Sequence, residues 1–564
     1  MRKNFTLRKI RTLLSVVLGF TFLMAFPAVS DAQVRVPFTQ RTSQYTPAQT
    51  IYNIKGDFTM IGNTNLTLQN YADNLGNENN MVYVDVDGVS NTFNSSSATL
   101  GFSTENGAIP ECSNIIYAGL YWTGWAHDGT SPNTFEVTKD VPGTIPQAIN
   151  NDLVISTTNS IQYTNYQLTV IRSGVFNNRT LTYRFSPQNA LGDIVEFIYA
   201  HNNGNQTLQV SINGGPVTSV STSSIDADNA YLSTPYVIYS ESGGITLTVN
   251  RLYRDGRNST AQSARAFVNV SGTYFPLVSL TKPLDKSVVY LKHESASGYT
   301  QINATDVNFT RNIYYPTNTD GYMYSAYAEV TDYVRQNGIG EYFVADIALR
   351  EGNGGGTGFF GGWGLIVVYE NSLMKYRNIT IFDGHAYVVG STTTSQEIPV
   401  SGFQTVPDGD VIMKLGLMAG EGDRGISGDY FQIRNYSDNQ WINLTHGGNT
   451  TNNFFNSSIF IENTERNPNL VNNTGLDISM FEIPNANNSI ITNDQTSTTF
   501  RYGTTQDTYI IFCMAMAVEA YTPEPLASNE VITVNDQPYI PGNPVLPGDE
   551  IEYTLEVLNY GTEA

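Results

Sequence analysis

The sequence predicts an all-β protein, a multi-domain β-sandwich, and three observations support this fold class. Short runs in which apolar and polar residues alternate recur along the chain, for example at 207–212 and 245–249, with Gly, Asn, Asp or Ser between them. The composition suits strands and turns, because the chain has 35 Tyr and only 14% charged residues. One short segment, 331–335, has the capping residue and the following glycine of a helix. Alternation with frequent turns is typical of sandwiches and barrels.

Two uninterrupted apolar runs predict strands that are buried on both faces. They lie at 365–369 and 510–518. Both are shorter than the roughly 20 residues that a helix needs to cross a bilayer. We therefore expect them in the core of the protein rather than in a membrane.

Changes in composition predict four segments. Residues 1–32 have the pattern of a signal peptide, and 33–138 together with 283–521 are expected to form a parent, jelly-roll-like sandwich. Residues 139–282 are richer in Asn, Ser and Thr and end at a Lys-Pro step, which indicates an inserted β-sandwich domain. Residues 522–564 begin with a proline-containing linker, and about three strands there are too few to close a sandwich. We expect this last segment to be the first part of an Ig-like domain.

The first residues have the order of a secretory signal. A basic start is followed by an apolar run at 13–26 and by a small-residue cleavage site before Gln33. The run is short for a membrane span, and no cysteine follows it to carry a lipid. The sequence therefore predicts a secreted protein with no transmembrane segment in the mature chain.

The charge balance excludes one class of partner. The chain has 29 Lys and Arg against 51 Asp and Glu, which gives a formal net charge of −22. A nucleic acid would be repelled by such a surface, so we expect no nucleic-acid partner. Cations are attracted instead.

The two cysteines, Cys112 and Cys513, each lie in an apolar run that has the pattern of a strand. Export makes a disulfide between them possible, and closing so long a loop would contribute about 5 kcal/mol in the chain-entropy model. The alternative is two buried thiols. Neither cysteine has the spacing of a zinc site.

Asp85 and Asp87 form the first candidate calcium site. Two positions apart on a strand, they would share one face with about 6.6 Å between their Cα atoms, directly before Gly88. Calcium takes six to eight oxygen ligands and accepts carboxylates close to a turn. The alternative is an ordinary solvated strand face.

The second candidate calcium site is the loop at 421–429. Glu421, Asp423 and Asp429 place three carboxylates and several glycines within nine residues. Oxygen ligands on a flexible loop suit calcium. The alternative is an ordinary acidic loop without a metal ion, in which Arg424 would neutralise one of the carboxylates. Neither candidate matches the twelve-residue calcium loop between two helices.

Several stretches resemble a known class of proteins. Residues 547–562 are similar to the opening half of the Ig-like conserved-repeat domain found in tandem in very large bacterial surface proteins. The parent domain resembles the N-terminal region of the same class at 84–88, 93–98, 117–122, 329–334, 361–370, 378–384, 421–423 and 428–429. Members of the class are exported adhesin-type proteins, some linked to gliding motility. The resemblance implies display on the bacterial cell surface and brings no catalytic residues.

Two functions from different classes follow. The first is a non-enzymatic adhesin or interaction protein that binds a glycan or a protein and is stabilised by calcium. The second is a secreted polysaccharide hydrolase with accessory binding domains, since two suitably spaced carboxylates suffice for glycoside hydrolysis. The chain has neither the paired histidines of a zinc protease nor the Gly-x-Ser-x-Gly elbow of a serine hydrolase, so the first function is favoured.

Overall fold

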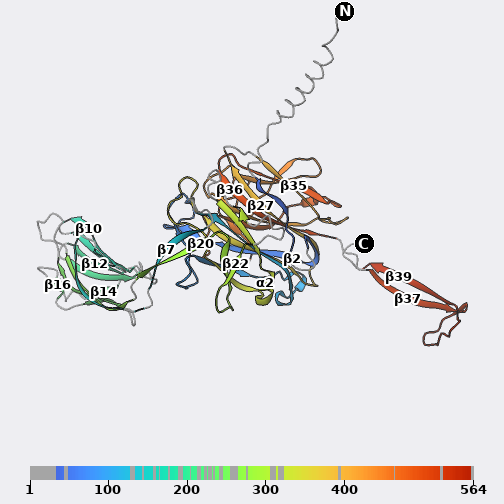
Figure 1. Cartoon of the computed structure of the whole chain (residues 1–564), viewed down its shortest axis with the longest axis horizontal. Coiled ribbons are helices and arrows are strands. Elements are labelled where there is room, and N and C mark those ends of the chain that lie inside the picture. Colours follow the sequence, from blue (N-terminus) through green and yellow to red (C-terminus); the bar gives the residue numbers. More distant parts are fainter. Residues whose placement is uncertain are drawn as a thin grey trace, which may run out of the picture. The chain divides into compact units, whose positions relative to one another are not determined.

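The computed structural model consists almost entirely of strands and the turns between them, which confirms the all-β prediction (Figure 1). It describes residues 34–559, with gaps at 44–48, 127–133, 143–144, 146, 157–160, 164–165, 176–177, 188–194, 203–204, 213–217, 221–224, 227–230, 233–235, 241–244, 254–264, 275–276, 305–312, 315–322, 391–394, 463 and 521–524. The expected signal peptide lies outside the described residues.

The chain divides into two compact units. Unit 1 holds Met1–Phe135 and Pro283–Ala564, and unit 2 holds Glu136–Lys282, which nearly coincides with the segment expected as an insert. None of the helices among the described residues is long and apolar enough to cross a membrane.

An eleven-stranded sheet forms the centre of unit 1. Ten of its strands lie side by side in this order: β23 (Ile313–Tyr314), β24 (Met323–Glu329), β6 (Asn114–Trp125), β26 (Gly361–Glu370), β2 (Ile51–Thr64), β27 (Tyr376–Val389), β36 (Thr508–Glu519), β29 (Met413–Gly422), β34 (Gly475–Glu482) and β32 (Ile459–Phe460). The remaining strand, β1 (Val34–Gln40), pairs with β27.

Two smaller sheets and a strand pair complete the sandwich layers of unit 1. One has the order β22 (Thr300–Asn303), β21 (Val288–His293), β25 (Gly340–Ala345), β5 (Ser95–Leu100) and β33 (Arg466–Asn467). The other has the order β28 (Gln396–Ser401), β35 (Ser497–Gly503), β30 (Tyr430–Arg434) and β31 (Trp441–Asn443). Strands β3 (Leu66–Leu68) and β4 (Met81–Tyr83) pair with each other.

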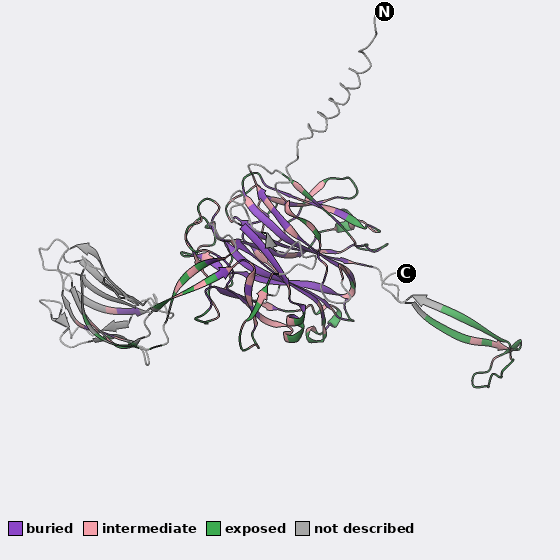
Figure 2. Cartoon of the chain, viewed as in Figure 1, coloured by how far each residue is buried: buried purple, intermediate pink, exposed green. Residues whose placement is uncertain are grey.

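The central strands are buried on both faces, as their uninterrupted apolar runs predict. Along β36, Met514 and Met516 pack in a cluster shared with β28, β30 and β35, whereas Cys513 and Ala515 pack in a second cluster within the large sheet. Every residue from 365 to 369 and from 510 to 518 is buried (Figure 2). Burial of both faces explains why period-two alternation is missing from these strands.

A pair of tryptophans links the large sheet to the β5 sheet. Trp122 on β6 and Trp363 on β26 lie opposite each other in the register, and both are fully buried. The indole N–H of Trp122 donates to the Lys286 carbonyl at 2.8 Å, and that of Trp363 donates to the Ser96 hydroxyl at 2.9 Å. Buried indoles need such partners, so these bonds fix where the two sheets meet.

The helix expected near 331–335 is present as α2 (Thr331–Asn337). It ends at Gly338, which has φ of +77° and is therefore in a conformation that favours glycine.

Unit 2 consists of sheets alone in its described part. Its six-stranded sheet has the order β14 (Thr218–Val220), β13 (Asn205–Ile212), β12 (Val195–Asn202), β11 (Asn178–Pro187), β10 (Tyr166–Val175) and β9 (Ile161–Tyr163). Its four-stranded sheet has the order β17 (Tyr236–Ser240), β18 (Ile245–Tyr253), β19 (Arg265–Tyr274) and β8 (Gln147–Ser156). Two further pairs are β15 (Ile225–Asp226) with β16 (Tyr231–Leu232), and β7 (Thr134–Pro142) with β20 (Leu277–Asp285). Residues 134–135 of β7 and 283–285 of β20 belong to unit 1.

The last described strands form a separate three-stranded sheet. Its order is β38 (Gln537–Pro538), β37 (Pro525–Val534) and β39 (Ile551–Asn559). Most of its described residues are exposed (Figure 2). Tyr553 and Leu555 on β39 are each 61% exposed. The assignment of this segment to an Ig-like domain stays a prediction.

Candidate metal centre

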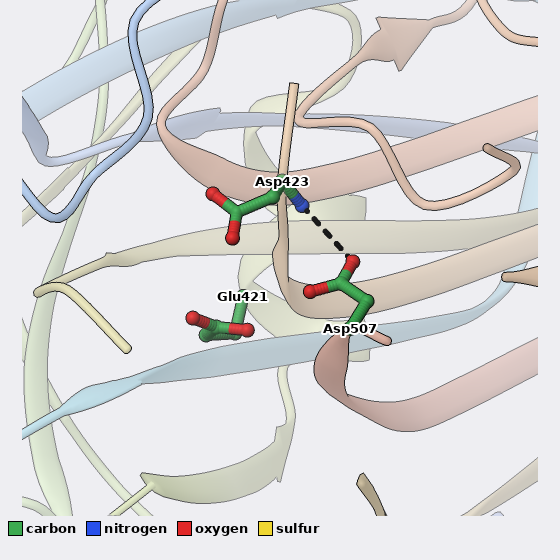
Figure 3. A group of neighbouring side chains, drawn as sticks. All are labelled: Glu421, Asp423 and Asp507. Atoms are coloured by element: carbon green, nitrogen blue, oxygen red, sulfur yellow. Dashed lines mark hydrogen bonds between the residues drawn. The ribbon is translucent and has the colours of Figure 1, made fainter. Parts of the chain in front are cut away.

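A group of buried carboxylates lies at one end of the large sheet. Glu421 is at the end of β29, and Asp507 directly precedes the neighbouring strand β36. Because the two strands are antiparallel, the end of one lies beside the start of the other, and Asp423 follows β29 into the same region. Glu421, Asp423 and Asp507 are called the acidic cluster below. Figure 3 shows that their carboxylates turn toward a common region.

The spacing of the acidic cluster suits one shared cation. One carboxylate oxygen from each of the three residues lies within 4.8 Å of the other two. Calcium binds protein oxygens at about 2.3–2.6 Å, so two of its ligands lie at most about 5 Å apart. Among the residues that the structure describes, no other three metal-ligating side chains come together in this way.

Because the acidic cluster is buried, keeping its carboxylates ionised costs free energy unless a positive charge lies beside them. Glu421 and Asp507 are each 1% exposed, and Asp423 is 6% exposed. Oε2 of Glu421 has no hydrogen-bond partner among the described residues. A buried polar group without a partner costs about 1–3 kcal/mol, and a charged one costs more. A proton or a cation must therefore compensate these oxygens.

Asp429 and Asp477 add two half-satisfied carboxylates close to the acidic cluster. Asp429 precedes β30, and its Oδ2 accepts a bond from the backbone N–H of Phe455 at 2.7 Å. Asp477 lies on β34, and its Oδ1 accepts bonds from the backbone N–H groups of Asn456 and Ser458, both at 2.9 Å. The other oxygen of each aspartate has no partner among the described residues. Both oxygens remain available to a cation.

The pKa values of all five carboxyl groups are raised, first of all by burial. The pKa rises to about 7 for Asp423, about 6 for Asp429, about 8 for Asp477 and about 9 for Asp507. The pKa of Glu421 lies well above its ordinary value because of burial and, after that, the charges of Asp507 and Asp423. These shifts favour the neutral acids in the metal-free protein, and a bound divalent cation reverses that preference.

The backbone is distorted where β29 enters the acidic cluster. Glu421 has φ of +76°, and a bulge separates Gly420 from Gly422 in the pairing with β34. Bulges often re-aim side chains next to functional sites. A Cβ on Gly422 would lie 2.4 Å from the Phe455 carbonyl oxygen and 2.5 Å from Oδ2 of Asp477, so only glycine fits there.

Three of the candidate ligands expected from sequence lie in or beside this centre. Glu421 and Asp423 belong to the acidic cluster, and Asp429 flanks it. Sequence reasoning missed Asp507 and Asp477. The position of each residue could have indicated its role. Asp507 directly precedes the apolar run of β36, and Asp477 is an acidic residue within the mostly buried strand β34.

The strand expected to carry Asp85 and Asp87 ends earlier than predicted. Strand β4 stops at Tyr83, so Asp85 and Asp87 do not share a strand face. The carboxylate of Asp87 instead accepts bonds from the Thr92 hydroxyl at 2.9 Å, the Val89 N–H at 2.7 Å and the Tyr299 hydroxyl at 2.6 Å. Asp85 accepts a bond from the Ser95 hydroxyl at 3.0 Å. The hydrogen bonds of these aspartates stabilise a turn, so the chain does not form the strand that the alternating pattern predicts.

The disulfide considered between Cys112 and Cys513 is not formed. Cys112 is exposed in a 3-10 turn (Pro110–Cys112), whereas Cys513 is fully buried within β36. The expectation of a strand at Cys112 is also wrong, because β6 begins at Asn114.

Comparisons with known proteins assign the chain to no family. No family model and no curated protein matches it. Among solved structures, PNGF-II in two crystal forms aligns with 72% of this chain and with 100% and 98% of its own length. The sequence identities are 10% and 9%, and the TM-score is 0.17 in both cases. A TM-score this low carries no argument about fold or function.

Proposed function

We propose that the chain is a non-enzymatic surface adhesin or interaction protein whose parent sandwich is stabilised by calcium. The observation that carries the calcium part is the acidic cluster, in which three buried carboxylates converge and Oε2 of Glu421 has no partner among the described residues. The adhesin part, with a glycan or a protein as partner and the cell surface as location, rests on the sequence resemblance and on the expected signal peptide.

Calcium at this position would connect strands that are far apart in the sequence. The acidic cluster joins the end of β29 to the start of β36, and Asp477 adds β34. A cation shared by these strands closes one end of the large sheet, and its binding energy adds to the free energy of unfolding. Such a device suits a protein that must remain folded outside the cell.

The geometry of the acidic cluster disfavours the hydrolase alternative. A glycosidase needs two carboxyl groups that flank a bound sugar, one of them as general acid. The pKa of about 7 at Asp423 would suit a general acid, but Asp423 is 6% exposed and Glu421 only 1%. A polysaccharide does not reach carboxylates that are buried to this degree.

Isothermal titration of the chelator-treated chain with calcium tests the proposal. We expect binding to one site in the wild type, and loss of that binding in Glu421→Gln. Asp408→Asn is the matched control, because Asp408 is an exposed acid outside the acidic cluster. Absence of calcium binding by a folded wild-type chain would refute the calcium part. Release of reducing sugars from polysaccharides by the purified chain would refute the non-enzymatic part.

A further inference from the structure

A second site of different chemistry lies on the face of the large sheet where β2 begins beside β27. A pocket of about 450 Å³ opens there, within the roughly 300–1,000 Å³ usual for ligand sites. Its floor holds the cross-strand pair Asn53 and Asn378, together with Tyr376 two positions before Asn378. Side chains two apart on a strand point to the same face, so Tyr376 and Asn378 both face the pocket.

The wall of the pocket is the segment that follows β28. It runs from Gly402 to Pro407 and brings Gln404 to the pocket. The wall is fixed by neighbouring structure, because Phe403 is buried in the core beside β28 and the Thr405 hydroxyl donates to the Thr492 carbonyl at 2.8 Å. A wall held in this way reduces the conformational entropy that a ligand must overcome.

Close approach of this wall to β2 depends on Gly402. It has φ of +96°, and a Cβ there would lie 2.6 Å from Nε2 of Gln40 and 2.9 Å from Cδ1 of Ile51. The same Gln40 Nε2 donates to the Ser401 carbonyl at 3.0 Å. The pocket is therefore formed by the fold itself.

The polar groups of the pocket are uncharged. Among the described residues that line it, the polar side chains are amides, a hydroxyl and a phenol: Asn53, Asn378, Gln404, Thr405 and Tyr376. The Asn378 amide donates to Oδ1 of Asn53 at 2.5 Å, and its own Oδ1 accepts from the Gln404 backbone N–H at 3.0 Å. These bonds orient Asn378. The side chains of Gln404 and Tyr376 also line the pocket, and because Gln404 is exposed and Tyr376 is half-buried, a ligand can contact them.

We infer that this pocket binds a neutral carbohydrate. Amides offer paired donors and acceptors to vicinal hydroxyls, and the flat faces of Tyr376 and Pro407 offer surfaces for a sugar ring. The described lining has no charge to attract an anionic sugar and no carboxyl group to cleave a glycosidic bond. A peptide strand is less well matched, because the pocket is lined by side chains and not by an open strand edge, since β2 and β27 are paired. The inference rests on the proposed binding function and assigns it a site and a ligand class.

Saturation-transfer NMR on the full chain tests the inference. The probes are neutral hexoses, N-acetylhexosamines and their disaccharides, with a uronic acid as the charged comparison. We expect signals from at least one neutral sugar and none from the uronic acid. Tyr376→Ala should weaken binding about tenfold, since loss of one aromatic contact of about 1.5 kcal/mol corresponds to that factor. Gln404→Ala, at an exposed position, should weaken it without affecting the fold.

Tyr436→Ala is the matched control. Tyr436 is 62% exposed and does not line the pocket, so binding should be unchanged. A neutral sugar that binds equally well to the wild type and to Tyr376→Ala and Gln404→Ala would overturn the pocket assignment and leave the proposed function intact. If the chain captures a cell-surface protein but no sugar, the inference fails while the proposed function stands. Absence of any sugar or protein partner would remove both.

Discussion

The backbone nitrogen of Asp423 lies 3.4 Å from Oδ2 of Asp507, although the two residues are 84 positions apart in the chain. Asp423 follows β29 and Asp507 precedes β36, so this contact marks where two central strands meet at the acidic cluster. Both side chains are buried, and burial is the main reason why their pKa values are raised. The charge of Asp423 raises the pKa of Asp507 further, and the charges of Glu78 and Asp429 do the same for Asp423. A cation between them would turn this repulsion into attraction.

Replacing Asp507 with asparagine should have opposite effects in calcium and in chelator. In chelator, Asp507→Asn should leave the melting temperature unchanged or raise it, because it removes one buried acid from a group of like charges. In calcium, the variant should lose the stabilisation that the wild type gains. Thermal melts in both conditions measure this, with Asp408→Asn as the control. A variant that loses as much stability in chelator as in calcium would show that Asp507 has only a structural role.

The metal-free chain should become less stable as the pH rises. The folded-state pKa values of about 6 to 9 at Asp429, Asp423, Asp477 and Asp507 exceed the value of about 3.9 in an unfolded chain. The folded state therefore binds more protons than the unfolded state, and stability falls as the pH rises from about 4 through these values. The slope is about 1.4 kcal/mol per pH unit for each proton held.

Denaturant titrations in chelator and in calcium, at pH values between about 5.5 and 8.5, measure this dependence. Calcium should become more stabilising toward higher pH, because its binding displaces protons from the carboxyl groups. Metal-free stability that is flat or increases over this range would contradict the assignment of raised pKa values to these residues.

Gly422→Ala should destabilise unit 1 by about 1–3 kcal/mol, the usual cost of overpacking a close contact. The added methyl group would collide with the Phe455 carbonyl and with Oδ2 of Asp477. Gly425→Ala is the control, since a Cβ there meets nothing within 4 Å. Denaturant titrations of both variants measure the difference. Equal stability of the two would mean that β29 and the chain at Phe455 do not approach each other as described.

The cysteines should differ in reactivity. Cys112 is exposed and Cys513 is fully buried, so a thiol reagent should label one group in the native chain and two after unfolding. A reducing agent should not change the melting temperature. If the unfolded, unreduced chain shows no reactive thiol, a disulfide joins Cys112 and Cys513 and the described arrangement is wrong.

Sequence patterns predicted the fold class and the central strands because these depend on local information. The apolar runs of β26 and β36 carry the signature of burial on both faces without knowledge of their neighbours. The prediction of a strand at Asp87 was wrong. It relied on the alternation of Val and Asp alone, whereas the carboxylate of Asp87 accepts hydrogen bonds from the Val89 N–H and the Thr92 hydroxyl in the turn that follows.

The candidate metal centre was only partly predictable for a different reason. Glu421 and Asp423 lie in one acidic loop and are visible in the sequence, but Asp507 joins them through the pairing of β29 with β36. Register across distant strands cannot be read from spacing along the chain. The neutral pocket at Asn53 and Asn378 depends on the pairing of β2 with β27 in the same way.

The melting temperature of the purified chain in calcium and in excess chelator tests the central claim most directly. If one ion binds at the acidic cluster, free calcium at 1,000 times the dissociation constant should stabilise the chain by about 4 kcal/mol, and the transition should move to higher temperature as calcium is added. Magnesium at the same concentration should have a smaller effect, because it loses its water ligands reluctantly. Identical melting curves in calcium and chelator would contradict the proposed calcium site.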